Sequence, residues 1–200
     1  MRIVITERQL NNLISPNVEG LEDLMNQIID KFPEVEDYKD RLIDFINKSN
    51  CQKIEFATMQ HAGGLSLHNS VLLNKILLNR DLNSLIFIIF HEIAHQYQFK
   101  KYGAEKMYEL YTGKIHLEDA VDFLYNTEIT ADEFAFRKVK EFHKLGLLKT
   151  ITDMRMYKKM GKHNLANMYN QVKKILSVRK GDSPDEVSEV LYNFIKIKIE

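Results

Sequence analysis

The chain has 200 residues, of which 44% are hydrophobic, and its 28 Lys and Arg residues balance 28 Asp and Glu residues. A chain of this length can bury one sizeable core, so we expect one domain with a helical extension. The formal net charge of zero excludes the strongly basic balance of a nucleic-acid binder. The single cysteine, Cys51, excludes an intramolecular disulfide and a Cys-rich zinc ribbon, and we expect it to be an ordinary core residue of a cytoplasmic protein.

The apolar segments of the chain are short. The longest strongly apolar run covers residues 85–90, far fewer than the roughly 20 residues that a helix needs to cross a bilayer. The apolar run within residues 1–7 is also too short for the central region of a signal peptide. We therefore expect no membrane association.

Helices are predicted first along the chain. The β-branched residues 3–5 favour a short strand, and a capping-box pattern then predicts a helix over 7–14. Apolar residues recur at helical spacing over 19–31, which indicates an amphipathic helix. Pro33 opens a further helix with one apolar face.

Strands are predicted in the next part of the chain. Residues 53–59 alternate between apolar and polar, and Gly63-Gly64 marks a turn. Residues 65–67 and 71–73 also favour strand, whereas 74–80 are ambiguous between strand and helix.

Helices dominate the rest of the chain. Asp81 is a plausible N-cap for a long helix over 82–101 that Gly103 ends. Thr127 is expected to cap a helix over 128–145 that Gly146 ends. Further helical segments are predicted over 107–111, 117–125 and 151–179, and from Ser183 onward.

The order of these elements indicates an α+β fold, mostly helical, with a small sheet beside the helix over 82–101. We expect one domain over residues 1–145. Residues 146–200 are expected to form a C-terminal helical extension packed on the same domain.

The helix over 82–101 carries the motif His91-Glu92-Ile93-Ala94-His95. Two histidines four residues apart lie on one face of a helix, one turn apart, so both imidazoles can bind one zinc ion. Glu92 lies between them and can act as general base on a water that the zinc activates. The alternative is a buried helix with two hydrogen-bonded histidines.

A third metal ligand must come from elsewhere in the chain. The metzincin extension of this motif requires glycine and histidine where this chain has Gln98 and Lys101, so that class is excluded. The better candidate is Glu128, 33 residues after His95. The alternatives are an exposed acid near a helix N-terminus for Glu128, and His116 as the third ligand of an all-histidine site.

Asp132 follows Glu128 by four residues and shares its helix face. We expect its carboxylate to accept the free ring N–H of a metal-binding histidine, preferentially His91. Such a bond fixes the tautomer of the histidine and raises its basicity as a ligand.

Together, the HExxH motif and the later Glu128-x-x-x-Asp132 pattern resemble the gluzincin class of zincin metallopeptidases. The string Glu-x-x-Ala-Asp-x-Phe-Ala over 128–135 is similar to the minimal membrane-linked gluzincins and to the ImmA/IrrE peptidases. The resemblance covers about 45 residues, roughly 91–136. The chain departs from the first family by its lack of membrane spans. It departs from the second because the Leu-rich, Pro-ended sequence that usually follows the string is absent, and this chain reads Phe136-Arg137-Lys138-Val139 instead.

The resemblance implies a zinc metallopeptidase domain over 1–145 that hydrolyses a peptide or protein substrate. It implies Glu92 as general base and a zinc ion on His91, His95 and Glu128, supported by Asp132. Residues 65–73 would supply the edge strand that binds an extended substrate.

The resemblance also implies a hydrogen-bond donor for the oxyanion of the transition state. The candidates in this sequence are His116, His143, His163, Tyr97, Tyr125 and Tyr157. His61 and His68 flank the glycine pair and can contact substrate, although a polar turn is the favoured explanation for them.

Two other functions remain as alternatives. One is a structural or binding subunit of a larger assembly, such as a virus particle, with a latent or structural metal site and residues 146–200 as its docking surface. The other is a DNA–protein-crosslink peptidase of the SprT sort. The neutral charge, the absent Cys-rich ribbon and the lack of a nearby third histidine argue against the latter. The oligomeric state is left open.

Overall fold

A computed structural model of the chain describes residues 18–59, 63–106 and 117–148. The elements expected over 3–5, 7–14, 107–111 and 151–179, and the helix expected from Ser183, lie outside these residues. The same holds for nearly all of the expected C-terminal extension.

The described residues form an α+β fold that is mostly helical and contains a small sheet, which confirms the predicted class. In chain order, the elements are α2 (Leu21–Lys31), the 3₁₀ helix η1 (Pro33–Tyr38), α3 (Lys39–Asn47), β1 (Lys53–Ala57), β2 (Gly64–Leu67), β3 (Ser70–Asn74), the 3₁₀ helix η2 (Lys75–Asn79), α4 (Leu82–Tyr102) and α6 (Leu117–Lys144).

Among the described residues, the sheet has three strands in the order β1-β3-β2. The central strand β3 pairs with β1 in parallel, with Ile54 opposite Val71, and with β2 in antiparallel, with Leu67 opposite Ser70. Ile54 and Val71 are both fully buried, and the burial of Ile54 agrees with the alternation that predicted a strand over 53–59. In this part of the chain, β2 therefore lies at one edge of the sheet.

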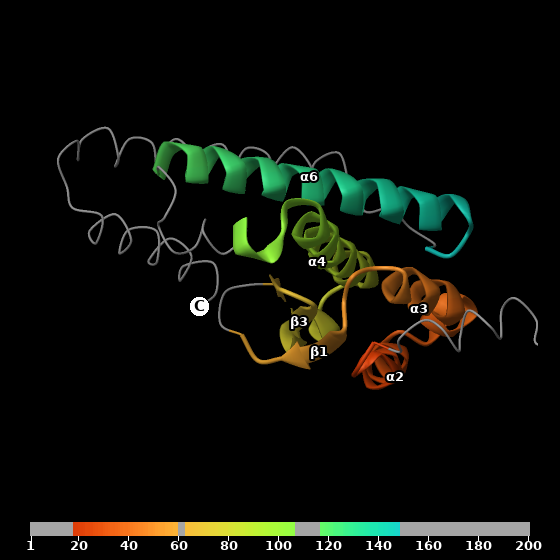
Figure 1. The fold of residues 1–200 in the computed structure, drawn as a ribbon. Coiled ribbons are helices and arrows are strands. Elements are labelled where there is room, and N and C mark those ends of the chain that lie inside the picture. The colour runs from red at the N-terminus through yellow and green to blue at the C-terminus, as the bar shows by residue number, and fades with distance from the viewer. Residues whose placement is uncertain (1–17, 60–62, 107–116, 149–200) are drawn as a thin grey trace, which may run out of the picture.

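Helix α4 lies between α6 and the sheet (Figure 1). A helix covered on both sides must be apolar around most of its circumference, which explains the continuous apolar run over 85–90. Its predicted ends are confirmed. The Asp81 side chain accepts a hydrogen bond from the Ser84 backbone N–H at 2.9 Å, and Gly103, with a φ of 84°, ends the helix.

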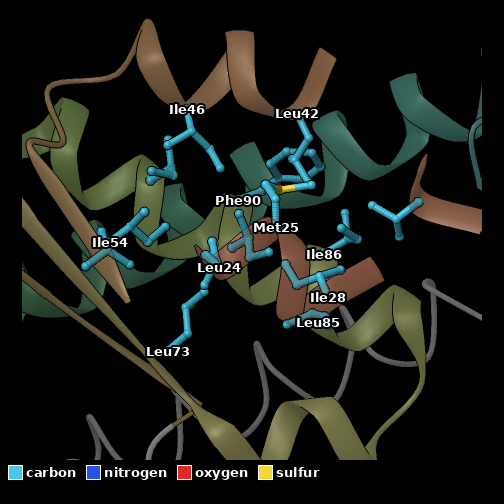
Figure 2. Close-up of a cluster of buried hydrophobic side chains, with 14 of the residues drawn as sticks. Leu24, Met25, Ile28, Leu42, Ile46, Ile54, Leu73, Leu85, Ile86 and Phe90 are labelled. Atoms are coloured by element: carbon cyan, nitrogen blue, oxygen red, sulfur yellow. The ribbon is translucent and has the colours of Figure 1, made fainter. Parts of the chain in front are cut away.

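The hydrophobic core joins α4 to the N-terminal helices and the sheet (Figure 2). The Phe90 ring packs edge-on against Phe45 of α3 with 4.9 Å between ring centroids, and it lies 5.1 Å from Phe142 of α6. The largest fully buried side chains are Phe90, Leu24, Met25, Ile28, Leu42, Ile46, Ile54, Leu73, Leu85, Ile86, Ile89 and Ile93.

The predicted helix start at Thr127 is wrong, because α6 is one continuous helix from Leu117 to Lys144. Neither glycine nor proline occurs within it to interrupt the backbone. The Thr127 side chain is buried in mid-helix. The nearby Thr130 hydroxyl donates to the Asn126 carbonyl at 2.8 Å, so the helix itself accommodates these threonines.

Three other boundaries differ from the prediction. Pro33 opens the 3₁₀ helix η1 before α3 begins, and the strand expected over 53–59 ends at Ala57. The ambiguous stretch over 74–80 is mainly the 3₁₀ helix η2. Asn74 ends β3, and its side chain accepts a hydrogen bond from the Ile76 backbone N–H at 3.1 Å, which starts the tighter helix.

Replacing Phe90 by alanine is expected to lower the free energy of unfolding by about 3–5 kcal/mol, because it leaves a cavity where three helices meet. Urea unfolding measures this change. Ile76→Ala is the control, since Ile76 is 51% exposed, and its effect is expected to stay within about 0.5 kcal/mol. Equal losses for the two variants would contradict the described core.

Candidate metal centre

The interface between α4 and α6 brings together residues that are far apart in the sequence. His91 and His95 project from α4, and Glu128 projects from α6. Glu128 continues a buried stripe of α6 that recurs every three or four residues. The other members of this stripe are Ala131, Ala135, Val139 and Phe142. Because two of them are alanines, the backbones of α4 and α6 can approach closely next to the histidines.

The three side chains converge on one point. His91 Nε2 lies 3.1 Å from His95 Nε2 and 3.5 Å from a carboxylate oxygen of Glu128, and His95 Nε2 lies 3.7 Å from the other oxygen. Ligands of a tetrahedral zinc ion lie roughly 3.3 Å apart, given zinc–ligand bonds of about 2.0–2.1 Å. Within the described ranges, this is the one group of three or more His, Cys, Asp or Glu side chains in which one ligand atom from each residue lies within 4.8 Å of the others.

Asp132 orients the first histidine. Its carboxylate lies 2.9 Å from His91 Nδ1 and can only accept a hydrogen bond when it is ionised. In the neutral imidazole the proton therefore resides on Nδ1, and the lone pair of Nε2 faces the centre of the cluster. This is the arrangement that metal-binding histidines generally have.

Gln98 orients the second histidine. Its side-chain oxygen lies 2.8 Å from His95 Nδ1, and its amide nitrogen donates to the Thr127 carbonyl at 2.8 Å and to the Thr130 hydroxyl at 2.9 Å. Since the amide nitrogen must face these two oxygens, the amide oxygen accepts from His95 Nδ1. His95 thus also presents the lone pair of Nε2 to the centre.

The charges around the cluster favour a cation at its centre. Burial lowers the pKa of the His91 imidazole, but the hydrogen bonds to Asp132 and Glu128 and the nearby charge of Glu92 outweigh this effect and raise it to about 10. Three carboxylates therefore act on one imidazole. The geometry and the electrostatics both fit a divalent metal ion bound by His91, His95 and Glu128.

Glu92 lies in the same turn of α4 and is almost fully buried, with 5% of its surface exposed. Its charge acts on His91, as the raised pKa of that imidazole shows. Its backbone carbonyl accepts a hydrogen bond from the Ser66 hydroxyl of β2 at 3.1 Å. Glu92, which the sequence places between the two histidines, therefore lies next to the edge strand β2 in the structure.

The four residues predicted for the metal site lie together in the structure. The structure brings together His91, His95 and Glu128, and it places Asp132 on His91 as expected. Glu128 lies in the middle of α6 rather than near a helix N-terminus, so the alternative of an exposed N-terminal acid is wrong.

Sequence reasoning missed the role of Gln98, which counted only as a departure from the metzincin pattern. Its position three residues after His95 placed it on the same helix face. The available signal was thus a polar side chain beside a predicted ligand.

The oxyanion-donor candidates are only partly within the described residues. His143 is 15 residues beyond Glu128, which is roughly 22 Å along the helix, and it bonds the Leu148 carbonyl at 2.7 Å. Tyr97 packs its ring against Phe134, with 5.7 Å between centroids. Tyr125 precedes Glu128 by three residues and so shares its helix face. The candidates His116, His163 and Tyr157 lie outside the described residues.

The remaining expectations concern His61, His68 and Cys51. His61 lies outside the described residues, and His68 is exposed in the turn between β2 and β3, with its ring 5.9 Å from that of Phe99. Cys51 is buried, as expected for a core residue, and burial raises the pKa of its thiol to about 11. A thiol with that pKa is a poor nucleophile near neutral pH.

Comparison with known proteins adds no relative: no family model, no curated protein and no solved structure matches this chain. The similarity of residues 91–136 to gluzincins thus stays a prediction from the motifs. Over the described part of the chain, no helix combines the length and the apolar character needed to span a bilayer.

Removing either orienting side chain is expected to weaken zinc binding about 10–100-fold, because the histidine loses its fixed tautomer and orientation. The variants are Asp132→Ala and Gln98→Ala, and a competition titration with a chromophoric chelator measures the affinity. Asp119→Ala, on an exposed part of the same helix, is the matched control and is expected to bind zinc like the parent. Unchanged affinity in the first two variants would show that these bonds do not support a metal.

Proposed function

We propose that this protein is a zinc-dependent metallopeptidase in which His91, His95 and Glu128 hold the metal and Glu92 is the general base. The observation that carries this proposal is the convergence of the three side chains, with separations of 3.1–3.7 Å, next to the turn of α4 that carries Glu92. Three protein ligands leave a fourth position of a tetrahedral zinc ion open, as catalytic zinc sites require.

When bound, zinc would lower the pKa of a water molecule to near 7 and polarise the substrate carbonyl. Glu92 would accept the proton of that water and later deliver it to the leaving amine. Its burial removes competing solvent from the carboxylate, and its fixed place in α4 holds it beside the two histidines. Asp132 and Gln98 would keep both imidazoles in the tautomer that this chemistry needs.

The arrangement of β2 supports a peptide as substrate. Among the described residues, β2 pairs only with β3, so its other edge can accept an extended chain by strand addition. Gln96 of α4 donates to the carbonyls of Leu67 and Ser70 at 2.8 and 3.1 Å and so fixes the hairpin against the helix. A peptide added to this edge would run past the turn that carries Glu92.

The proposal needs a donor to the oxyanion of the transition state, and Tyr125 is the candidate that the described residues favour. It lies one turn before Glu128 on the same face of α6 and is half-buried. A phenolic O–H is a suitable donor for this role.

Glu92→Gln is expected to retain zinc and to lose peptidase activity by about 10²–10⁴-fold, because the amide cannot accept the proton. Zinc content by atomic spectroscopy and cleavage of an unbiased peptide library, read by mass spectrometry, give the two quantities. Glu141→Gln, at a half-exposed position of α6, is expected to match the parent in both.

Two results would count against the proposal. A parent protein that binds zinc but cleaves no peptide would favour a metal-holding structural or binding protein. Full activity in Glu92→Gln would place the general base elsewhere.

A further inference from the structure

Gly64, the first residue of β2, packs directly against the side chain of Glu92. A Cβ atom added at Gly64 would lie 2.5 Å from Cγ of Glu92, 2.6 Å from its Oε1 and 2.8 Å from its Cδ. Non-bonded heavy atoms do not approach so closely without displacement. The backbone of Gly64 is ordinary extended strand, so Glu92, rather than a special φ angle, excludes a side chain at this position.

Neither partner in this contact can retreat easily. Glu92 is 5% exposed, and its backbone carbonyl is bonded to the Ser66 hydroxyl at 3.1 Å. The fully buried Gln96, one turn further along α4, donates to that same hydroxyl and to the Leu67 carbonyl. These hydrogen bonds hold β2 against α4. They therefore resist the separation of strand and helix that a side chain at position 64 would require.

We propose that Gly64 is a positioning residue for Glu92. Its lack of a side chain lets the carboxylate pack on the backbone of the edge strand, which holds the base at the place where a peptide added to β2 would pass. This inference rests on the proposed function for its catalytic meaning. The steric coupling of the two residues can be tested without any activity.

The neighbouring Gly63 provides a matched control. A Cβ atom there would meet Cδ1 of Ile88 at 3.2 Å, so only the end of a flexible apolar side chain has to move slightly. The same glycine-to-alanine change can thus be made at two adjacent positions, of which only one faces Glu92.

The first test is a double-mutant cycle on the full chain, with thermal unfolding measured in the presence of a chelator. Gly64→Ala is expected to lower the Tm by roughly 3–10 °C, because overpacking forces the buried carboxylate out of place. In the Glu92→Ala background, the same substitution is expected to leave the Tm unchanged or to raise it, because the shorter side chain frees the space. Gly63→Ala is expected to shift the Tm equally in both backgrounds. An equal loss from Gly64→Ala in both backgrounds would overturn the inference.

The second test uses the zinc-loaded protein and a peptide that the parent cleaves. Gly64→Ala is expected to lower kcat at least about tenfold with an unchanged zinc content, since a small displacement of a catalytic group has effects of this size or larger. Gly63→Ala is expected to keep the parent kcat. Parent-like kcat in Gly64→Ala would overturn the positioning role while leaving the proposed function intact. If the parent cleaves nothing, the proposed function fails, and the unfolding cycle still decides whether Gly64 positions Glu92.

Discussion

The packing of α6 on α4 is the contact on which the candidate site depends, because the two histidines lie on one helix and the glutamate on the other. The buried stripe of α6 includes Ala131 and Ala135, whose small side chains allow close approach of the helices. The same stripe continues into Glu128 and Asp132. Core packing and metal-ligand geometry are thus properties of one helix face. On the opposite side of α4, the sheet brings its edge strand to the turn that carries Glu92.

The site is built from a centre of nitrogen and oxygen atoms and a surrounding shell that orients them. Asp132 and Gln98 each accept a hydrogen bond from the Nδ1–H of one histidine, which turns both Nε2 atoms toward Glu128. The Gln98 amide is held in turn by backbone and hydroxyl oxygens of α6. The contact between α4 and α6 therefore also sets the tautomer of His95. Its loss would disturb the ligands without removing any of them.

Local signals in the sequence were sufficient for part of this arrangement. The spacing of His91 and His95 on a helix, the capping role of Asp81 and the end of that helix at Gly103 all depend on neighbours within a few residues. The sequence also predicted that Glu128 and Asp132, four residues apart, share one helix face. The continuity of α6 through Thr127 was not, because threonine is a favourable N-cap as well as a tolerated helix residue. The contact of Gln98 with His95 is local, but the orientation of its amide depends on Thr127, 29 residues away, and the role of Gly64 depends on Glu92; these long-range contacts appear only in the tertiary structure.

The most direct test of the central claim is anomalous diffraction at the zinc edge from crystals of the zinc-loaded protein. The account predicts one anomalous peak about 2.0–2.2 Å from Nε2 of His91, Nε2 of His95 and a carboxylate oxygen of Glu128. Zinc bound at another position, or loaded protein with no peak between these three side chains, would contradict it.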